Sequence, residues 1–253
     1  MKNTIVITNQ KGGVGKSTTA RALSECLQQR GFSVLLVDMD PQGNLSSAMG
    51  AAKSDRVFTA YDVLWEKCKA AEAIQHTDQG DIIPANILLA GAEQELVTAP
   101  AREQRLARGL RQVADRYDWI IIDTPPSLGL LTVNALVAAE RLIVPLEADE
   151  DSLQGLQQLR GTVDMVRKYL NPDIRIDGLL ITKYESNVNI RKGMRGVIEA
   201  MAEKIGCKVY EPISKGVMVV NARSEKIGLQ AYDKTAKPAK EYAAFTEAFL
   251  QEV

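Results

Sequence analysis

The sequence is poor in the residues that build disulfides, metal sites and aromatic clusters. Its 253 residues include three cysteines (Cys26, Cys68 and Cys207), one histidine (His76) and 5% aromatic residues. The cysteines show neither a Cys-x-x-Cys pair nor a metal-ligand spacing, so we expect reduced thiols, two of them in the core. His76 has no cysteine or histidine partner and is expected at the surface. This composition argues against a disulfide scaffold or a zinc site.

Long apolar runs and a strong net charge are also lacking. No apolar stretch reaches the ~18 residues of a membrane span, and the chain runs directly into a strand pattern instead of a signal peptide. The formal net charge is −1, which argues against a protein that binds nucleic acid with its whole surface. With 45% hydrophobic residues, a sizeable core is expected instead of disorder. We therefore expect a cytoplasmic protein without stable membrane insertion.

Continuous apolar runs alternate with helical periodicity along the chain. The runs predict buried parallel strands at 5–8, 33–37, 81–84, 119–122, 141–146, 177–182 and 208–210. The periodic segments predict helices at 17–30, 61–73, 100–117, 130–139, 151–170, 187–205 and 239–253. This alternation predicts an α/β fold with a doubly wound, mostly parallel sheet and helices on both faces. No repeat or linker interrupts it, so a single domain is expected over residues 1–253.

The first strand leads into a glycine-rich loop, Lys11-Gly12-Gly13-Val14-Gly15-Lys16-Ser17-Thr18, that opens a helix. Glycines let backbone N–H groups approach phosphate oxygens, and the helix N-terminus adds positive potential. Lys16 would reach the β- and γ-phosphates of a nucleotide, and the Ser17 hydroxyl would bind Mg²⁺. The loop departs from the usual Gly-x4-Gly-Lys-Ser/Thr pattern. Gln10 stands at the first glycine position, and Lys11 precedes the glycine pair.

Acidic residues end two later strands. Asp38-Met39-Asp40-Pro41-Gln42-Gly43-Asn44 follows the second strand, and Asp123 ends the strand at 119–122. In a parallel sheet such ends share the carboxyl edge, where ligands bind. One of Asp38 and Asp40 could organise the water shell of Mg²⁺ while the other orients an attacking water. From the residues alone, a loop-capping role for either is an equal alternative. Asp123 is expected to hold Mg²⁺ through a water.

These three stretches, in this order and spacing, resemble the ParA/Soj partition ATPases, whose deviant Walker A loop reads Lys-Gly-Gly-x-Gly-Lys-Ser/Thr. The likeness covers roughly the whole chain and is strongest over residues 2–146. It implies a Mg²⁺-dependent ATPase that is slow until a partner stimulates it. It also implies that ATP joins two subunits into a homodimer, in which Lys11 crosses to the phosphates held by the other subunit. The stretch at 124–129 would then act as a switch that senses the γ-phosphate.

The resemblance assigns roles to matching positions of this sequence. Catalytic roles fall on Lys11, Lys16 and Asp40, with Asp40 positioning the attacking water. ATP contacts are expected from Lys11, Gly12, Gly13, Val14, Gly15, Lys16, Ser17, Thr18, Asp38, Gln42 and Asp123. Mg²⁺ is expected at Ser17 and, through water, at Asp38 and Asp123.

Positive charge gathers in the last third of the chain. Residues 183–240 hold twelve Lys/Arg and six Asp/Glu, so the remainder is acidic. This asymmetry indicates a local polyanion footprint, with a solvated surface of chance clustering as the alternative. No aromatic residue interleaves with Arg191, Lys192 and Arg195, which favours phosphate contact over base stacking.

In ParA-like proteins this region binds double-stranded DNA without sequence preference. The candidates here are Arg191, Lys192, Arg195, Lys215 and Arg223. Met218 stands where the family has an arginine in Val-Arg-Leu-Ser-Glu-Ala, and Lys215 and Arg223 could compensate.

Other members of the superfamily remain as alternatives. A MinD-like membrane-cycling ATPase would need a basic amphipathic C-terminal helix, whereas residues 245–253 are acidic. A nitrogenase-iron-protein-like reductase would need cysteines between Asp123 and Glu150, and the sequence has none there. A dethiobiotin-synthetase-like ligase is disfavoured by the acidic stretch at 38–44, and a related tyrosine kinase by the lack of a C-terminal tyrosine cluster.

The first strand begins at residue 5, so we expect no N-terminal helix-turn-helix domain and no operator-specific repression. The resemblance predicts a nucleoid-associated ATPase that segregates plasmid or chromosomal DNA together with a ParB-like centromere-binding protein. An ATPase that positions another cargo is the alternative, beside the MinD-like one.

Overall fold

The computed structural model describes residues 3–52 and 57–252. These residues form one eight-stranded sheet with the strand order β3-β4-β2-β5-β1-β6-β7-β8. The strands are β1 (Thr4–Ile7), β2 (Val34–Asp38), β3 (Gln75–Thr77), β4 (Gly80–Ile83), β5 (Trp119–Asp123), β6 (Arg141–Leu146), β7 (Arg175–Ile181) and β8 (Lys208–Tyr210). Of these, β3 runs antiparallel to β4, and every other neighbouring pair is parallel. The predicted mostly parallel sheet is confirmed.

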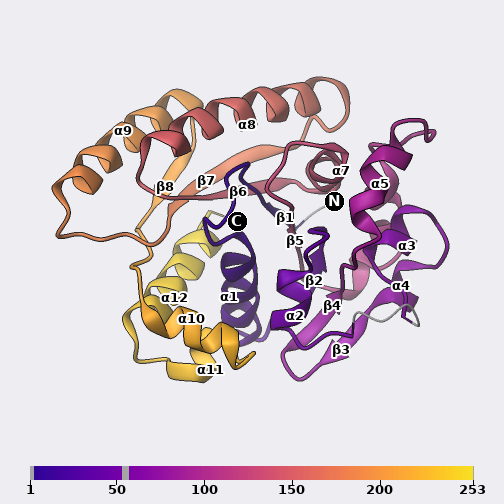
Figure 1. The fold of residues 1–253 in the computed structure, drawn as a ribbon, viewed down its shortest axis with the longest axis horizontal. Helices are drawn as coiled ribbons and strands as arrows, with labels where there is room; N and C mark the ends of the chain where they lie inside the picture. Colours follow the sequence, from indigo (N-terminus) through magenta and orange to yellow (C-terminus); the bar gives the residue numbers. More distant parts are fainter. Residues whose placement is uncertain (1–2, 53–56, 253) are drawn as a thin grey trace.

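Helices cover both faces of this sheet (Figure 1). One face packs against α3 (Ala60–Leu64), α4 (Ala70–Ala73), α5 (Leu89–Leu96), α6 (Arg105–Arg111), α7 (Leu130–Ala138), α8 (Glu150–Tyr169) and α9 (Asn189–Ile205). The other packs against α1 (Lys16–Gln28), α2 (Asn44–Ala48), α10 (Val217–Ser224), α11 (Leu229–Asp233) and α12 (Lys237–Leu250). In β1, Val6 faces the first layer, and Ile5 and Ile7 face the second. Because both faces are covered, the central strands are continuous apolar runs.

The order of the central strands brings the sequence motifs together. Strands β2, β5 and β1 are neighbours, and Asp38 at the end of β2 pairs in register with Asp123 at the end of β5. The glycine-rich loop leaves the same edge of the sheet from β1 and enters α1. A ligand at this edge is therefore within reach of all three motifs.

Two predicted helices are interrupted in the structure. The helix predicted at 61–73 is divided into α3 and α4, because Glu66 between them adopts a left-handed φ of 54°. The helix predicted at 100–117 begins only at Arg105 and ends in a 3₁₀ turn, η1 (Ala114–Arg116); Ala101, ahead of it, has a φ of 49°. The sequence pattern gives no signal for β3, α5, α10 or α11, each of eight residues or fewer.

The three cysteines and the single histidine differ in how deeply they are buried. Cys26 is buried in α1, whereas Cys68 and Cys207 are partly buried against the core. The exposed His76 side chain lies on β3, as predicted for a surface residue, and its Nδ1 lies 2.6 Å from Asp81 Oδ1. Within the described ranges, no helix combines the length and apolar character that crossing a membrane requires.

Candidate functional site

A cavity of about 520 Å³ opens at the carboxyl edge of the sheet. Its volume lies within the range of roughly 300–1,000 Å³ that small-molecule and cofactor sites occupy. Most of the predicted ATP-binding residues line it, namely Gly12, Gly13, Gly15, Lys16, Ser17, Thr18 and Gln42, and so does Asp40, which was predicted as a catalytic residue. Val14, Asp38 and Asp123 are buried and do not line this cavity. The structure thus brings together residues that three separate motifs supply.

Hydrogen bonds from neighbouring strand ends hold the glycine-rich loop. Thr182, which follows β7, donates from Oγ1 to the carbonyl of Val14 at 2.8 Å. The Asn9 side chain accepts from the backbone N–H of Lys11 at 3.0 Å and donates to the carbonyl of Pro145 at 2.7 Å. The loop is therefore fixed by the sheet itself, which lowers the entropy cost of ordering it around a ligand.

Lys16 is a nearly buried cation at the base of this cavity. Its Nζ donates to the carbonyl of Lys11 at 3.1 Å, so the side chain curls back along the loop. Gly13 and Gly15 permit that path, because their φ values of 77° and 87° are unfavourable for other residues. Burial lowers the pKa of Lys16, while Asp123 and Asp40 act to raise it. A phosphate group in the cavity would supply a counter-charge close to this ammonium.

Asp123 is the buried carboxylate with the strongest need for a cation. Neither of its oxygens has a hydrogen-bond partner among the described residues, and both are shielded from solvent. Burial and the neighbouring Asp38 carboxylate raise the pKa of Asp123 well above its usual range, although the nearby Ser17 hydroxyl and the Lys16 ammonium oppose this. Orphaned carboxylate oxygens at a phosphate-binding loop suit Mg²⁺, which takes one or two carboxylates together with waters and substrate phosphates. In keeping with such a shared site, the described residues contain no group of three His, Cys, Asp or Glu placed to hold a metal.

Asp38 and Asp40 differ in their surroundings. Asp38 accepts from the N–H and hydroxyl of Ser46 at 2.8 and 2.6 Å and from the N–H of Asp40 at 3.0 Å. Burial nevertheless raises the pKa of Asp38 to about 6. Asp40 instead lines the cavity, and its Oδ1 accepts from the N–H of Gln42 at 3.0 Å. Asp38 therefore ties α2 and the residues that precede it to the sheet, and Asp40 is the carboxylate that can face a water in the cavity.

Comparison with known proteins agrees with this geometry. A family model described as an AAA domain matches residues 2–176. The chain is 46% identical over 215 residues to the sporulation initiation inhibitor protein Soj of Bacillus subtilis, with 84% of each protein covered. It is 46% identical over 188 residues to the chromosome partitioning protein ParA of Myxococcus xanthus, covering 74% of this chain and 66% of that protein. The chain belongs to the ParA/Soj family of ATPases.

Solved structures extend the likeness over the whole chain. Cobyrinic acid a,c-diamide synthase from Mycobacterium smegmatis, with bound ADP and magnesium, has a TM-score of 0.85 at 34% identity and covers 100% of this chain and 95% of its own. A putative plasmid partition protein from Borrelia burgdorferi, bound to AMPPNP, has a TM-score of 0.84 at 26% identity, with 100% of each chain covered. The ParA/Soj resemblance predicted from three motifs is confirmed.

The lysine typical of the ParA/Soj loop lies outside the cavity. The Nζ of Lys11 is 2.6 Å from Asp149 Oδ2 and 3.7 Å from Asp151 Oδ2, both at the start of α8. Burial acts to lower the pKa of Lys11, but the bond to Asp149 and the nearby carboxylates raise it overall. Asp149 also caps α8 by accepting from the N–H of Ser152 at 3.0 Å. The Lys11 ammonium is therefore bound within its own chain, at the N-terminal cap of α8.

Four of the five predicted DNA-binding residues lie on or next to α9, and acidic residues accompany them. Arg191 and Lys215 share Glu185, at 3.6 and 3.4 Å. Arg195 pairs with Glu199 at 2.7 Å and with Glu211 at 3.3 Å. Lys192 lies on the same helix, and no ion pair involving it is found among the described residues. The α9 surface is therefore basic but largely neutralised by its own chain.

Arg223, the fifth predicted DNA-binding residue, makes its contacts elsewhere than around α9. It belongs to the last turn of α10 and lines the nucleotide cavity, where its Nη2 donates to Asn44 Oδ1 at 2.9 Å. The structure thus brings this predicted DNA-binding residue to the rim of the nucleotide cavity.

Sequence reasoning missed other parts of the cavity wall. Arg21, Lys183 and the apolar side of α10 also line it. Lys183 adopts a φ of 50° and pairs with Glu147 at 2.9 Å. Its position directly after a strand end, like that of Asp40, is a signal that could have identified it. Helix α10 has no such signal, because Ala222 is its one fully buried apolar residue and the others are exposed or only partly buried.

Proposed function

We propose that this partition ATPase is an ATP-gated switch on DNA. ATP with Mg²⁺ binds in the 520 Å³ cavity, two subunits join, and the dimer binds double-stranded DNA without sequence preference. Hydrolysis, stimulated by a ParB-like centromere-binding partner, then releases the protein from the DNA. The observation that carries this proposal is the pair of buried charges, Lys16 and Asp123, at a loop that the sheet already holds in place.

In this proposal different residues at the cavity have different roles in phosphoryl transfer. Lys16 stabilises negative charge on the β- and γ-phosphate oxygens, and the Ser17 hydroxyl and Asp123 hold Mg²⁺, Asp123 through water. When bound, Mg²⁺ would neutralise phosphate charge and polarise the γ-phosphoryl group. Asp40 orients the attacking water, because it is the strand-end carboxylate that lines the cavity. The backbone of the loop, residues 12–18, fixes the phosphates in line with that water.

In this proposal Lys11 links ATP binding to dimerisation. Its ammonium is held by Asp149 in one chain, and a nucleotide in the facing subunit offers a denser negative charge. Transfer of Lys11 from Asp149 to those phosphates would couple ATP binding to the subunit contact. Loss of the γ-phosphate removes part of that attraction, so hydrolysis weakens the dimer.

DNA binding is assigned to the surface around α9, where Arg191, Lys192, Arg195 and Lys215 gather. Exposed ion pairs contribute about 0–1 kcal/mol, so these cations can exchange their glutamates for DNA phosphates at little cost. The contacts would be to the backbone and therefore independent of base sequence. Binding of this kind would place the protein on the nucleoid. We further propose that residues 1–253 act as one ATPase domain, since a single sheet runs through the described residues.

The membrane-cycling alternative finds less support in the structure. The apolar side of the C-terminal helix α12 is buried, with Tyr242, Phe245 and Phe249 packed in the core. A helix that docks reversibly on a lipid surface has to present its apolar side to the bilayer. The packing of α12 therefore favours a structural role.

The decisive experiment measures binding to a random-sequence DNA duplex with ATP and Mg²⁺, with ADP, and without nucleotide, across a salt series. We expect ATP-selective binding that weakens steeply with salt, together with a doubling of mass by light scattering. Lys11→Ala should abolish the doubling of mass. The double variant Arg191→Ala/Arg195→Ala should weaken DNA binding and leave the doubling of mass unchanged. Nucleotide-independent binding, or no binding at all, would refute the proposed switch.

A further inference from the structure

Residues 217–233, which form α10, α11 and the turn between them, make up one wall of the nucleotide cavity. Five of these residues line the cavity, namely Val219, Val220, Ala222, Arg223 and Leu229. Only two apolar residues of the segment, Ala222 and Leu229, are buried. A segment with so few buried apolar contacts gains little stability from packing. Its position against the cavity therefore depends on polar contacts with neighbouring elements.

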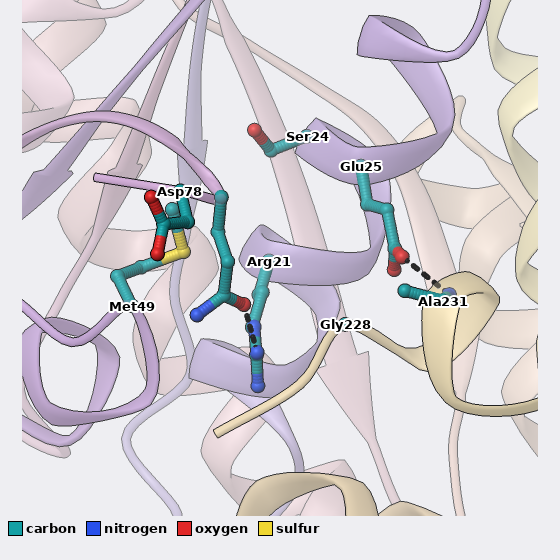
Figure 2. A pocket seen from close by; sticks show the side chains of 8 residues that line it. Arg21, Ser24, Glu25, Met49, Asp78, Gly228 and Ala231 are labelled. Carbon is teal, nitrogen blue, oxygen red and sulfur yellow. Dashed lines mark hydrogen bonds between the residues drawn. The ribbon is translucent and has the colours of Figure 1, made fainter. Parts of the chain in front are cut away.

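Glu25 of α1 binds the start of α11. Its Oε2 accepts from the backbone N–H of Gln230 at 3.1 Å, and its Oε1 accepts from the backbone N–H of Ala231 at 2.9 Å. Figure 2 shows the Glu25 carboxylate turned to Ala231. The first N–H groups of a helix have no partner within the helix, so one carboxylate here satisfies two of them. Because the acceptor is ionised, these hydrogen bonds are stronger than neutral ones.

Gly228, directly before α11, leaves room for this carboxylate. A Cβ atom at this position would lie 2.7 Å from Glu25 Oε2 and closer still to Oε1. The φ of Gly228 is −61°, which any residue can adopt. A side chain is therefore excluded here by the close approach of Glu25 and not by the backbone conformation.

Gln79, in the turn between β3 and β4, binds the same segment at a second point. Its Nε2 donates to the carbonyl of Lys226 at 2.8 Å, in the turn between α10 and α11. The same Nε2 donates to the carbonyl of Ala48 at 3.0 Å, the last residue of α2. Its Oε1 accepts from Nη2 of Arg21 on α1. One side chain thus joins α1, α2 and the α10–α11 turn.

A small cavity of about 130 Å³ lies between α1 and the start of α11 (Figure 2). Glu25, Gln79 and Gly228 all line it. Protein interiors are otherwise close-packed, and a void contributes no contacts. Apolar packing therefore contributes little at this junction, and the hydrogen bonds of Glu25 and Gln79 hold it together.

We propose that Glu25 is a positioning residue for nucleotide binding, which fixes α10 and α11 as a wall of the nucleotide cavity. Helix α1 begins with Lys16 and also carries Glu25, so one helix orients both the glycine-rich loop and the wall. This role rests on the proposed binding of ATP in that cavity. The loop takes the phosphates, so the largely apolar wall is left to contact the base and ribose.

Without Glu25 the wall would occupy its binding position for a smaller fraction of the time. The apparent affinity for a nucleotide falls in proportion to that fraction. A ligand that consists of phosphates alone would not be affected, because it needs only the loop. The role of Glu25 therefore differs from that of Lys16, which acts on every ligand that carries phosphates.

The test compares the Kd of ADP with that of inorganic pyrophosphate, both with Mg²⁺, by titration calorimetry. We expect Glu25→Ala to raise the Kd for ADP about 5- to 10-fold, since two charge-assisted hydrogen bonds are lost. The Kd for pyrophosphate should change little, whereas Lys16→Ala should raise both values. Thermal unfolding of each variant gives its Tm as a check on folding. A lower Tm of Glu25→Ala with an unchanged Kd for ADP would show a structural role only and would overturn the proposal.

Gly228→Ala tests the same contact from the other side. The added methyl group should displace the Glu25 carboxylate and raise the Kd for ADP, as Glu25→Ala does. The double variant Glu25→Ala/Gly228→Ala should be no weaker than either single variant, because both changes remove one contact. Glu247→Ala is the matched control. It removes a carboxylate that pairs with Arg30 of α1 and should leave the Kd for ADP unchanged.

The remaining outcomes separate this role of Glu25 from the proposed ATPase. Failure of the wild type to bind ADP would refute the proposed function and, with it, the role of Glu25. If the wild type binds ADP, three results would refute the role of Glu25 alone. These are an unchanged Kd for ADP in Glu25→Ala, an equal loss of ADP and pyrophosphate binding, and additive effects of Glu25→Ala and Gly228→Ala.

Discussion

The glycine-rich loop and the α9 surface both carry positive charge, but they hold it in opposite ways. Lys16 is 7% exposed and lies near carboxylates that are themselves buried, and Asp123 has no hydrogen-bond partner among the described residues. On α9, the Arg195 side chain is 30% exposed and is paired with two glutamates. One region is incomplete without a ligand, whereas the other is satisfied by its own chain.

This difference indicates how much each region depends on its ligand. Buried charges have already lost their hydration, so a bound phosphate and cation supply interactions that the protein cannot obtain otherwise. The α9 cations exchange one exposed ionic partner for another, and each exchange contributes little. Nucleotide binding should therefore depend strongly on single residues, and DNA binding on several weak contacts acting together.

The largest expected effect comes from Lys16→Ala in the loop. Removing the cation that faces the phosphates should lower ATP hydrolysis by at least ~100-fold, the range lost with one preorganised electrostatic donor. A single-turnover hydrolysis assay measures this. Lys183→Ala at the cavity rim is the matched control, and its loss should be much smaller because Lys183 is more exposed. Similar losses of ATP hydrolysis in Lys16→Ala and Lys183→Ala would contradict the view that the buried cation matters most.

The buried carboxylates should make the stability of the ligand-free protein depend on pH. The pKa of Asp38 rises from an ordinary value near 4 to about 6 on folding, so between these values the folded state binds the additional proton. The free energy of unfolding should therefore fall as pH rises from about 4 to about 6, by on the order of 2 kcal/mol from this group.

Urea unfolding at pH 4.5 and pH 7, for wild type and Asp38→Asn, measures the contribution of Asp38. The asparagine variant should show a smaller difference between the two pH values. An equal pH dependence in both proteins would show that burial of Asp38 does not govern it.

A smaller effect is expected at the basic surface. Arg195→Ala should weaken ATP-dependent DNA binding only about 2- to 5-fold and reduce the salt slope by about one phosphate contact. Arg223→Ala, at the nucleotide cavity, should instead raise the Kd for ATP and leave the salt slope of DNA binding unchanged at saturating ATP. Fluorescence anisotropy with labelled duplex and with labelled nucleotide separates the two. A smaller salt dependence of DNA binding in Arg223→Ala would instead show that Arg223 contacts DNA phosphates.

The smallest effect is expected from the contact that holds Lys11 in its own chain. Asp149→Asn should weaken the ion pair and favour the ATP dimer by a few-fold, in line with a partly exposed pair worth about 0–1 kcal/mol. Sedimentation over an ATP series would detect the shift. Ser152→Ala removes the hydroxyl hydrogen bond to Asp149, keeps the backbone one, and should leave the dimer equilibrium unchanged. A weaker dimer in Asp149→Asn would show that the pair assists assembly.

The sequence by itself determined seven of the eight strands, the glycine-rich loop and the strand-end carboxylates. Each of these depends on neighbours in the chain: apolar runs that need burial on both faces, glycines followed by Lys16 and Ser17, and acids directly after a strand. Local breaks such as the left-handed Glu66 were not predictable, because no proline or glycine marks them.

Tertiary structure alone decided which distant side chains meet. Lys11 and Asp149 are 138 residues apart, and Arg223 and Asn44 are 179 apart. The charge pattern that predicts a basic segment does not reveal that glutamates neutralise α9, that Arg223 belongs to the nucleotide cavity, or that Arg21 is buried. Periodicity encodes whether a side chain is buried, whereas its partner depends on how the helices of different segments pack across the sheet.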